Sequence, residues 1–325
     1  MRAPYERDRQ PGNFAPYKVS SGHTDSGDFV VSGGSMFVLS AGVASATTVS
    51  SGGFLTINKG GSGSGSHLSG GNETISGTET GGFIESGGSQ RVLAPGKAIS
   101  TTVDSSGTLT VLSGGTASAA IVNNGGNMLV AKGGVVAGVT INAGAVVSNA
   151  GIVKANSALS AVIGGVVTNA NTIEALGSGA VVKIFGSITD TGTVLASGNG
   201  AHVELDGGAA ILGGKLQTLA GGKIDANNGV LSGVTIASGS IVDINNNGTL
   251  ALSGRIANSG LISALGSPSF ATLAISGAVV LSGGGKVSLS PSGNNQIVAA
   301  PAFFSMQTRS MPASSRQRRA AARSC

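Results

Sequence analysis

The sequence predicts an all-β fold, a parallel β-helix or solenoid of about 13 rungs. Three observations lead to this prediction. A unit of 19 residues recurs from Ser32 onward. Within each unit apolar and polar residues alternate, which is the period of a half-buried strand. The 325 residues include 56 Gly but only 9 Phe, 2 Tyr and no Trp, so the core must come from Val, Ile, Leu and Ala.

The 19-residue register is clearest between Ser32 and Asn142. In five units, glycine fills the third and eleventh positions, and an apolar residue fills the seventh and eighteenth. These columns read Gly34, Gly53, Gly88, Gly107, Gly126; Gly42, Gly61, Gly96, Gly115, Gly134; Val38, Ile57, Val92, Val111, Val130; and Val49, Leu68, Val103, Val122, Ile141. A shorter unit of 16 residues, Gly70 to Glu85, interrupts the register.

Beyond residue 143 the residues that make up the repeat change, while its period stays near 20. A motif Asn/Asp-x-Gly/Asn-x-apolar-x-Ala recurs at Asn149, Asn169, Asp190 and Asn258. Residues 173–186 also match residues 194–207 position by position, at a spacing of 21. The solenoid is therefore expected to continue to Val298.

Stacking explains why such a unit repeats. Each unit offers strands of four or five residues closed by Gly-Gly or Asn-Gly, residues that tolerate the positive φ of a tight turn. One unit cannot bury its own apolar edge, whereas stacked units bury it continuously and pair each backbone group with the next rung. The column Val38/Ile57 and the column Val92/Val111/Val130 are expected to lie inside one core at strand spacing.

Composition and charge exclude several classes. Disordered chains are less hydrophobic and usually more charged, and no Gly-X-Y period of collagen is present. Residues 32–298 hold ten Lys or Arg and ten Asp or Glu, so the net charge of +5 lies after Val298. Nucleic-acid binding by the body therefore has no electrostatic support. A disordered basic tail at residues 299–325 could still bind polyanions without specificity.

Residues 32–142 resemble the 19-residue repeats of AIDA-type (diffuse-adherence) autotransporter adhesin passengers. Ser32–Ser50 and Ser86–Asp104 match the pattern SGG-x-x-x-V-x-x-GG-x-A-x-x-T-x-V at nearly every position. Residues 143–298 are similar to the degenerate passenger stretches that follow such repeats. The resemblance implies a right-handed β-helix on the surface of a Gram-negative bacterium, outside the outer membrane. It also implies a non-enzymatic role in self-association, cell–cell or surface adhesion and biofilm formation.

The two ends depart from that family. Residues 1–31 show no signal peptide and are expected to form an N-terminal cap or a leftover partial repeat. No translocator barrel follows the repeats. After Val298 the strand pattern stops, the chain turns basic, and it ends on its only cysteine, Cys325, as a frameshifted end would. The sequence thus predicts a fragment of an adhesin, and a truncated fragment without function is one alternative.

A β-helical polysaccharide-active enzyme is the other alternative, and it would need two carboxylates in one cleft. The one tight group is His202, Glu204 and Asp206, which should point outward from a solvated strand, with Lys183 opposite Glu204. Gly221-Gly222-Lys223-Ile224-Asp225 falls short of a calcium-binding nonapeptide. His23, His67 and His202 lie far apart, which argues against zinc. No catalytic residue, metal ligand or cofactor is predicted.

Binding is expected on two outward columns. Thr48, Thr102 and Thr140 share one, together with His67 and Ile121, and Arg91 and Thr110 share another. Stacked at strand spacing, such ladders would offer many weak hydrogen bonds to a second rod or to bacterial or host surface glycans and proteins. Threonine also simply suits exposed strands, so each residue has a purely structural interpretation as well.

Overall fold

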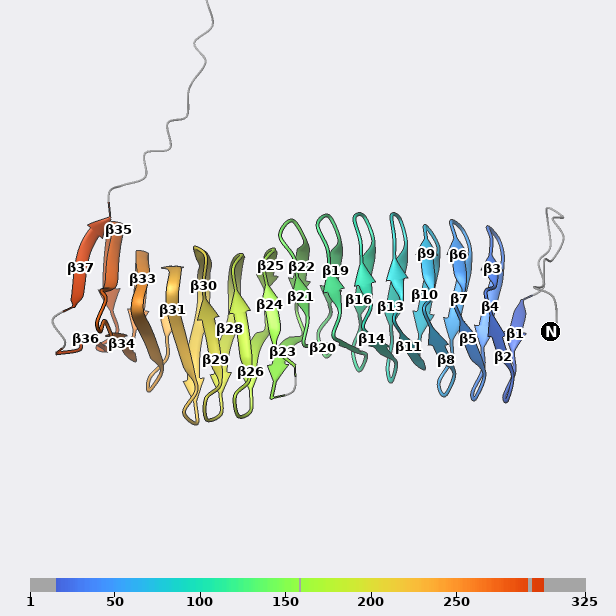
Figure 1. Cartoon of the computed structure of the whole chain (residues 1–325), viewed down its shortest axis with the longest axis horizontal. Helices are drawn as coiled ribbons and strands as arrows, with labels where there is room; N and C mark the ends of the chain where they lie inside the picture. Colours follow the sequence, from blue (N-terminus) through green and yellow to red (C-terminus); the bar gives the residue numbers. More distant parts are fainter. Residues whose placement is uncertain (1–15, 158, 292–293, 301–325) are drawn as a thin grey trace, which may run out of the picture.

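The structure is a computed structural model that describes residues 16–157, 159–291 and 294–300. These residues form one β-solenoid whose rungs stack along the long axis of a rod, from β1 at one end to β37 at the other (Figure 1). It makes about 14 turns, and the described residues contain strands but no helix. The predicted all-β parallel solenoid is confirmed.

Up to residue 184 each rung has three short strands, each pairing with its equivalent in the next rung. The first strands are β1 (Tyr17–Val19), β4 (Ser35–Val38), β7 (Phe54–Ile57), β10 (Asn72–Ile75), β13 (Ser89–Val92), β16 (Thr108–Val111), β19 (Asn127–Val130), β22 (Val146–Asn149) and β25 (Val166–Asn169). The second strands are β2 (Thr24–Ser26), β5 (Val43–Ser45), β8 (Ser62–Ser64), β11 (Thr78–Thr80), β14 (Lys97–Ile99), β17 (Thr116–Ser118), β20 (Val135–Ala137), β23 (Ile152–Asn156) and β26 (Thr172–Leu176). The third strands are β3 (Phe29–Val30), β6 (Thr48–Ser50), β9 (His67–Ser69), β12 (Phe83–Ile84), β15 (Thr102–Val103), β18 (Ile121–Val122), β21 (Thr140–Ile141), β24 (Ala161–Ile163) and β27 (Val181–Ile184).

Toward the C-terminal end, strands run on through the corners of the rung. First and second strands merge in β28, β30 and β35, a third strand merges with the first strand of the next rung in β31, and in β33 all three merge. These strands are β28 (Ser187–Ser197), β29 (His202–Leu205), β30 (Ala209–Leu219), β31 (Lys223–Ser232), β32 (Thr235–Ile236), β33 (Ile241–Asn258), β34 (Leu261–Ala264), β35 (Ala271–Ser282), β36 (Lys286–Leu289) and β37 (Asn295–Ala300).

The apolar columns of the repeat form the core. Val38 pairs with Ile57, and Val92 pairs with Val111, which pairs with Val130. The short rung joins the two runs, because Ile75 pairs with both Ile57 and Val92. All six side chains are fully buried. The expectation that these columns stack inside one core is confirmed, and so is the spacing of 21, since Ile173 pairs with Val194 and Ile184 with Leu205.

The Asn/Asp motif has a structural role that its spacing did not reveal. Asn149, Asn169 and Asp190 continue the column of Val130 into the next three rungs, and all three are buried. Asn149 donates to Asn169 and Asn169 to Asp190, each through Nδ2 to Oδ1 at 2.8 Å. The Oδ1 of each accepts the backbone N–H two residues on, which closes the corner. Asn258 makes the same corner bond but pairs with Ile236 in a different column.

Candidate binding groove

The outward faces of β27, β29, β31 and β33 carry a ladder of charged side chains in the C-terminal half of the rod. Lys183, Glu204, Asp225 and Asp243 occupy one outward column, because each pairs in register with the next. Their neighbours Val182, Val203, Ile224 and Val242 point inward and are fully buried. The strand alternation therefore directs each charged side chain away from the core.

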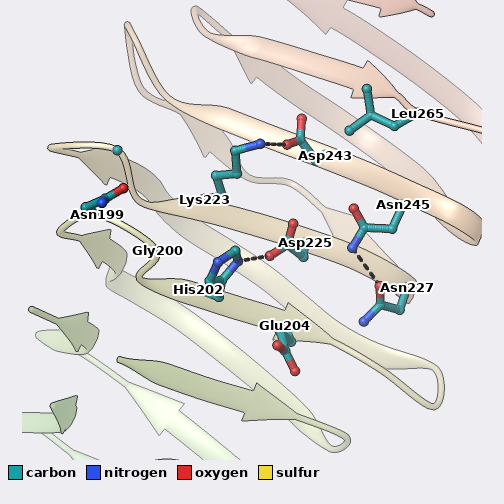
Figure 2. A pocket seen from close by; sticks show the side chains of 11 residues that line it. Asn199, Gly200, His202, Glu204, Lys223, Asp225, Asn227, Asp243, Asn245 and Leu265 are labelled. Carbon is teal, nitrogen blue, oxygen red and sulfur yellow. Dashed lines mark hydrogen bonds and ion pairs between the residues drawn. The ribbon is translucent and has the colours of Figure 1, made fainter. Parts of the chain in front are cut away.

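Lys183 of this ladder, and His202 and Lys223 of the neighbouring outward column, each contact an acid one rung further along. Lys183 Nζ lies 3.1 Å from Glu204 Oε2, which confirms the ion pair expected there. Lys223 Nζ lies 2.6 Å from Asp243 Oδ2, and His202 Nδ1 contacts Asp225 Oδ2 (Figure 2). The hydrogen bond to Asp243 is the main cause that raises the pKa of Lys223.

Two of these acids are buried although they point outward. Asp225 is 6% exposed and Asp243 is 3% exposed. A buried carboxylate is stable only when it is paired and hydrogen-bonded, so Lys223 holds Asp243 in place and the ring of His202 holds Asp225. The result is a rigid polar floor rather than a set of solvated side chains.

An amide ladder borders this floor. Asn227 Nδ2 donates to Asp206 Oδ1, and Asn245 Nδ2 donates to Asn227 Oδ1, both at 2.8 Å. Figure 2 shows Asn227 and Asn245 on neighbouring strands, beside Asp225 and Asp243. Each amide uses one N–H within the ladder and keeps a second N–H for a ligand.

These side chains line an open groove of about 500 Å³. Asn199, Gly200 and Leu265 complete its walls, and the groove extends over successive rungs. A second hollow of about 420 Å³ adjoins it, lined by Asp206, Asn227, Asn228, Asn246, Asn247 and Thr249. Together they make a polar trough in which parallel rungs present carboxylates and amides at strand spacing.

Neighbouring side chains engage the carboxyls of the groove. Lys183 pairs with Glu204 and Lys223 with Asp243. Asp225 contacts the ring of His202, and Asp206 accepts from Asn227. Within the described ranges, no group of three His, Cys, Asp or Glu side chains is placed to hold a metal ion.

The structure separates the predicted binding residues onto two strands of the rung. Thr48, Thr102 and Thr140 do share one outward column, but other side chains stand between them. From one end the column reads Phe29, Thr48, His67, Phe83, Thr102, Ile121 and Thr140. The rings of His67 and Phe83 stack with their centroids 4.8 Å apart, so this strip is partly aromatic.

Arg91 and Thr110 are paired neighbours on β13 and β16, in the column of Phe37, Thr56 and Thr74. They lie on the first strand of the rung, whereas the Thr48 column lies on the third. The structure therefore brings Arg91 together with Thr110 but not with Thr48, Thr102 or Thr140. All five are accessible or half-buried.

Sequence reasoning found His202, Glu204 and Asp206 but missed their partners Asp225, Asp243, Asn227 and Asn245. A signal was present, because polar residues recur in the outward column that Lys183 and Glu204 define. Uneven rung lengths concealed it. Hydrogen-bonded partners along the two ladders are separated by 23, 20, 21 and 18 residues.

A protein-family model described as adhesin of bacterial autotransporter system, probable stalk, matches residues 74–126. Residues 74–126 therefore carry AIDA-type autotransporter repeats. These AIDA repeats comprise the rungs from β11 to β18, and the groove lies outside them. The crystal structure of a TibC-catalysed, hyper-glycosylated TibA fragment aligns with 85% of this chain and 100% of that fragment, at 26% identity and a TM-score of 0.42. No curated protein matches the sequence.

Among the described residues there is no helix of the length and apolarity that crossing a bilayer requires. The described part of the chain is a β-solenoid throughout.

Proposed function

We propose that this chain is a passenger segment of a Gram-negative autotransporter adhesin, a non-enzymatic rod displayed outside the outer membrane. The AIDA-type stalk repeats support this role, and so does a rod geometry that stacks outward side chains at strand spacing along its length. Weak contacts that repeat along a rigid axis combine into strong attachment through avidity. Such a rod serves cell–cell adhesion, surface adhesion and biofilm formation.

The groove is the proposed contact surface, and a hydroxyl-rich saccharide is its proposed ligand. Its floor offers fixed carboxylate acceptors, and its wall offers the free N–H of Asn227 and Asn245. Sugar hydroxyls both donate and accept hydrogen bonds, so they match a surface where acceptors and donors alternate. The single observation behind this assignment is the burial of Asp225 and Asp243 in a groove of about 500 Å³.

Surface display tests the proposal. The full chain would be fused to an autotransporter translocator in a non-adherent bacterium, and cell sedimentation and binding to immobilised glycans would be measured. We expect displayed cells to aggregate or adhere, and Asn227→Ala with Asn245→Ala to reduce glycan binding at least tenfold.

Asn123→Ala with Asn142→Ala is the matched control. Asn123 and Asn142 form the same kind of amide ladder with Asp104, on rungs away from the groove. Equal loss in both variants would contradict the groove as contact surface. Cells that neither aggregate nor adhere would contradict the adhesin role itself.

A further inference from the structure

The lumen of the solenoid contains two glutamates in the rung of residues 70–85. Glu73 takes the inward position between Leu55 and Gln90, and Glu79 takes the inward position between Gly63 and Ala98. Glu73 is 1% exposed and Glu79 is 0% exposed. Ionisable side chains are almost never this buried without a charged partner.

Neighbouring residues accommodate this pair. Ser66 donates its N–H to Glu79 Oε1 at 3.0 Å and its hydroxyl to Glu73 Oε2 at 3.2 Å. Gln90 Nε2 donates to Glu73 Oε2 at 2.7 Å, and Thr101 Oγ1 donates to Gln90 Oε1 at 3.2 Å. All these side chains are buried.

The backbone also leaves room for Glu79. A Cβ on Gly63 would lie 1.9 Å from Glu79 Oε2, so the carboxyl occupies space that a side chain at Gly63 would fill. Ala44, Ala98 and Ala117 occupy the same column in other rungs. Gly63, Ser66 and Gln90 thus accommodate the two carboxyls in the core.

No cation faces the pair from the described strands around it. The inward neighbours on β7, β8, β9, β13, β14 and β15 are Leu55, Ile57, Gly63, Leu68, Gln90, Val92, Ala98 and Val103. The other charged groups of these rungs are accessible or half-buried on the outside, namely Lys59, His67, Glu85, Arg91, Lys97 and Asp104. Glu73 Oε1 and Glu79 Oε2 are buried without hydrogen-bond partners. Two carboxylates here would repel each other in a low dielectric, whereas two neutral carboxyls are tolerated.

We propose that the rung of residues 70–85 is a proton-operated weak point of the rod. It is closed while Glu73 and Glu79 are protonated, and it opens when they release their protons to solvent. Each rung contacts only its neighbours, so opening one rung turns a stiff rod into two segments joined by a hinge. Acid keeps the rod rigid, and alkali makes it flexible at this rung.

The pKa values give the pH window. Burial is the main cause that raises the pKa of Glu73 to about 8, and the charge of Glu79 adds to it. Burial raises the pKa of Glu79 to about 7. The open state releases protons near the ordinary glutamate pKa of about 4.3. Stability is therefore complete below that value, and it is lost as pH rises toward the raised values.

Hydrogen exchange read by mass spectrometry on the full chain tests the proposal between pH 5 and 9, after correction for intrinsic rates. Peptides within residues 66–101 are compared with peptides from residues 200–260. We expect the opening constant of the first region to rise up to about tenfold per pH unit for each carboxyl, and to level off near pH 8. The local comparison matters because the pKa values of Asp28, Glu174 and Asp190 are also raised.

Glu73→Gln with Glu79→Gln should remove the slope, because glutamine has the shape of a neutral glutamate and cannot ionise. If the double variant does not fold, each single variant should lower the slope of the opening constant against pH by the contribution of one carboxyl. Glu85→Gln is the matched control, since Glu85 is on the same rung but outside, and it should keep the slope. An unchanged slope in the Gln variants would overturn the proposal. Slower exchange at pH 8 on addition of Ca²⁺, seen in the unsubstituted chain but not in the Gln variants, would also overturn it. A bound cation would then replace the protons.

Discussion

At the scale of the residue, the two glycines of each Gly-Gly pair in the repeat have different structural roles. Gly125 has a φ of +74°, where a residue with a side chain is strained. Sequence reasoning assigned this positive-φ role to both glycines of the pair. Gly126 has no positive φ, yet a Cβ there would lie 2.7 Å from the carbonyl oxygen of Val103 on the preceding rung. The third-position glycine is therefore required by close approach of two rungs.

Gly107 and Ser106 separate these two effects in one corner. A Cβ on Gly107 would lie 2.4 Å from Ile84 O, whereas Ser106 already occupies a φ of +63°. Gly107→Ala should destabilise the rod by about 1–3 kcal/mol, because backbone of the neighbouring rung must move. Ser106→Gly should change stability by less than about 0.5 kcal/mol, since relief of strain offsets the added freedom of the unfolded chain.

Denaturant unfolding of the two variants measures both values. A Gly107→Ala variant as stable as the unsubstituted chain would show that the rungs can separate at no cost. Strong stabilisation by Ser106→Gly would instead show that backbone strain at this corner outweighs the freedom gained by the unfolded chain.

At the scale of the element, ladders of hydrogen-bonded polar side chains link successive rungs. The column of Val130 continues through Asn149, Asn169 and Asp190, whose side chains form hydrogen bonds from rung to rung inside the core. A comparable ladder of Asp104, Asn123 and Asn142 runs along the outside of the rod. The two ladders have the same chemistry and differ in burial.

Asn169→Ala is expected to lower the free energy of unfolding by about 1–3 kcal/mol, because Asn149 Nδ2 and Asp190 Oδ1 both lose a hydrogen-bond partner inside the core. Asn123→Ala should cost less than about 1 kcal/mol, since water replaces the lost partners there. Thermal unfolding of both variants, followed by circular dichroism, measures the difference. Equal costs would mean that burial does not strengthen the inner ladder.

At the scale of the whole molecule, the last described rung exposes apolar residues of the core columns. Leu281, Leu289 and Ile297 continue the inward columns of Ile256, Ala264 and Leu273. They are 46%, 45% and 54% exposed among the described residues, whereas the column members before them are buried. An edge strand that exposes apolar side chains is a template for pairing with another chain.

We therefore expect the rods to associate through this rung. Ile297→Lys should shift sedimentation of the full chain toward the monomer, because a charge on the last rung opposes stacking. Thr48→Lys with Thr102→Lys and Thr140→Lys, along the side of the rod, should leave the association constant within about twofold. The reverse result would assign association to the side of the rod, and a chain that is monomeric without substitution would contradict both modes.

The repeat by itself determined the solenoid, the register of its rungs, and which side chains face inward. A period of 19 places Val92 under Val111 without further information, since every backbone group must pair with the next rung. Alternation likewise predicted that His202 and Glu204 face outward, and Lys183 meets Glu204 as expected. These properties depend on spacing along the chain, which a sequence displays directly.

Only the tertiary structure decided which outward and inward polar groups meet. His202 contacts Asp225 on a diagonal, and Ser66 bonds to both Glu73 and Glu79 within the lumen. Such contacts depend on corner lengths, and these vary: β10 pairs Asn72 with Phe54, while β11 pairs Thr78 with Ser62. Uneven corners shift each rung against the next, so the period predicts the column of a residue but not its diagonal neighbours.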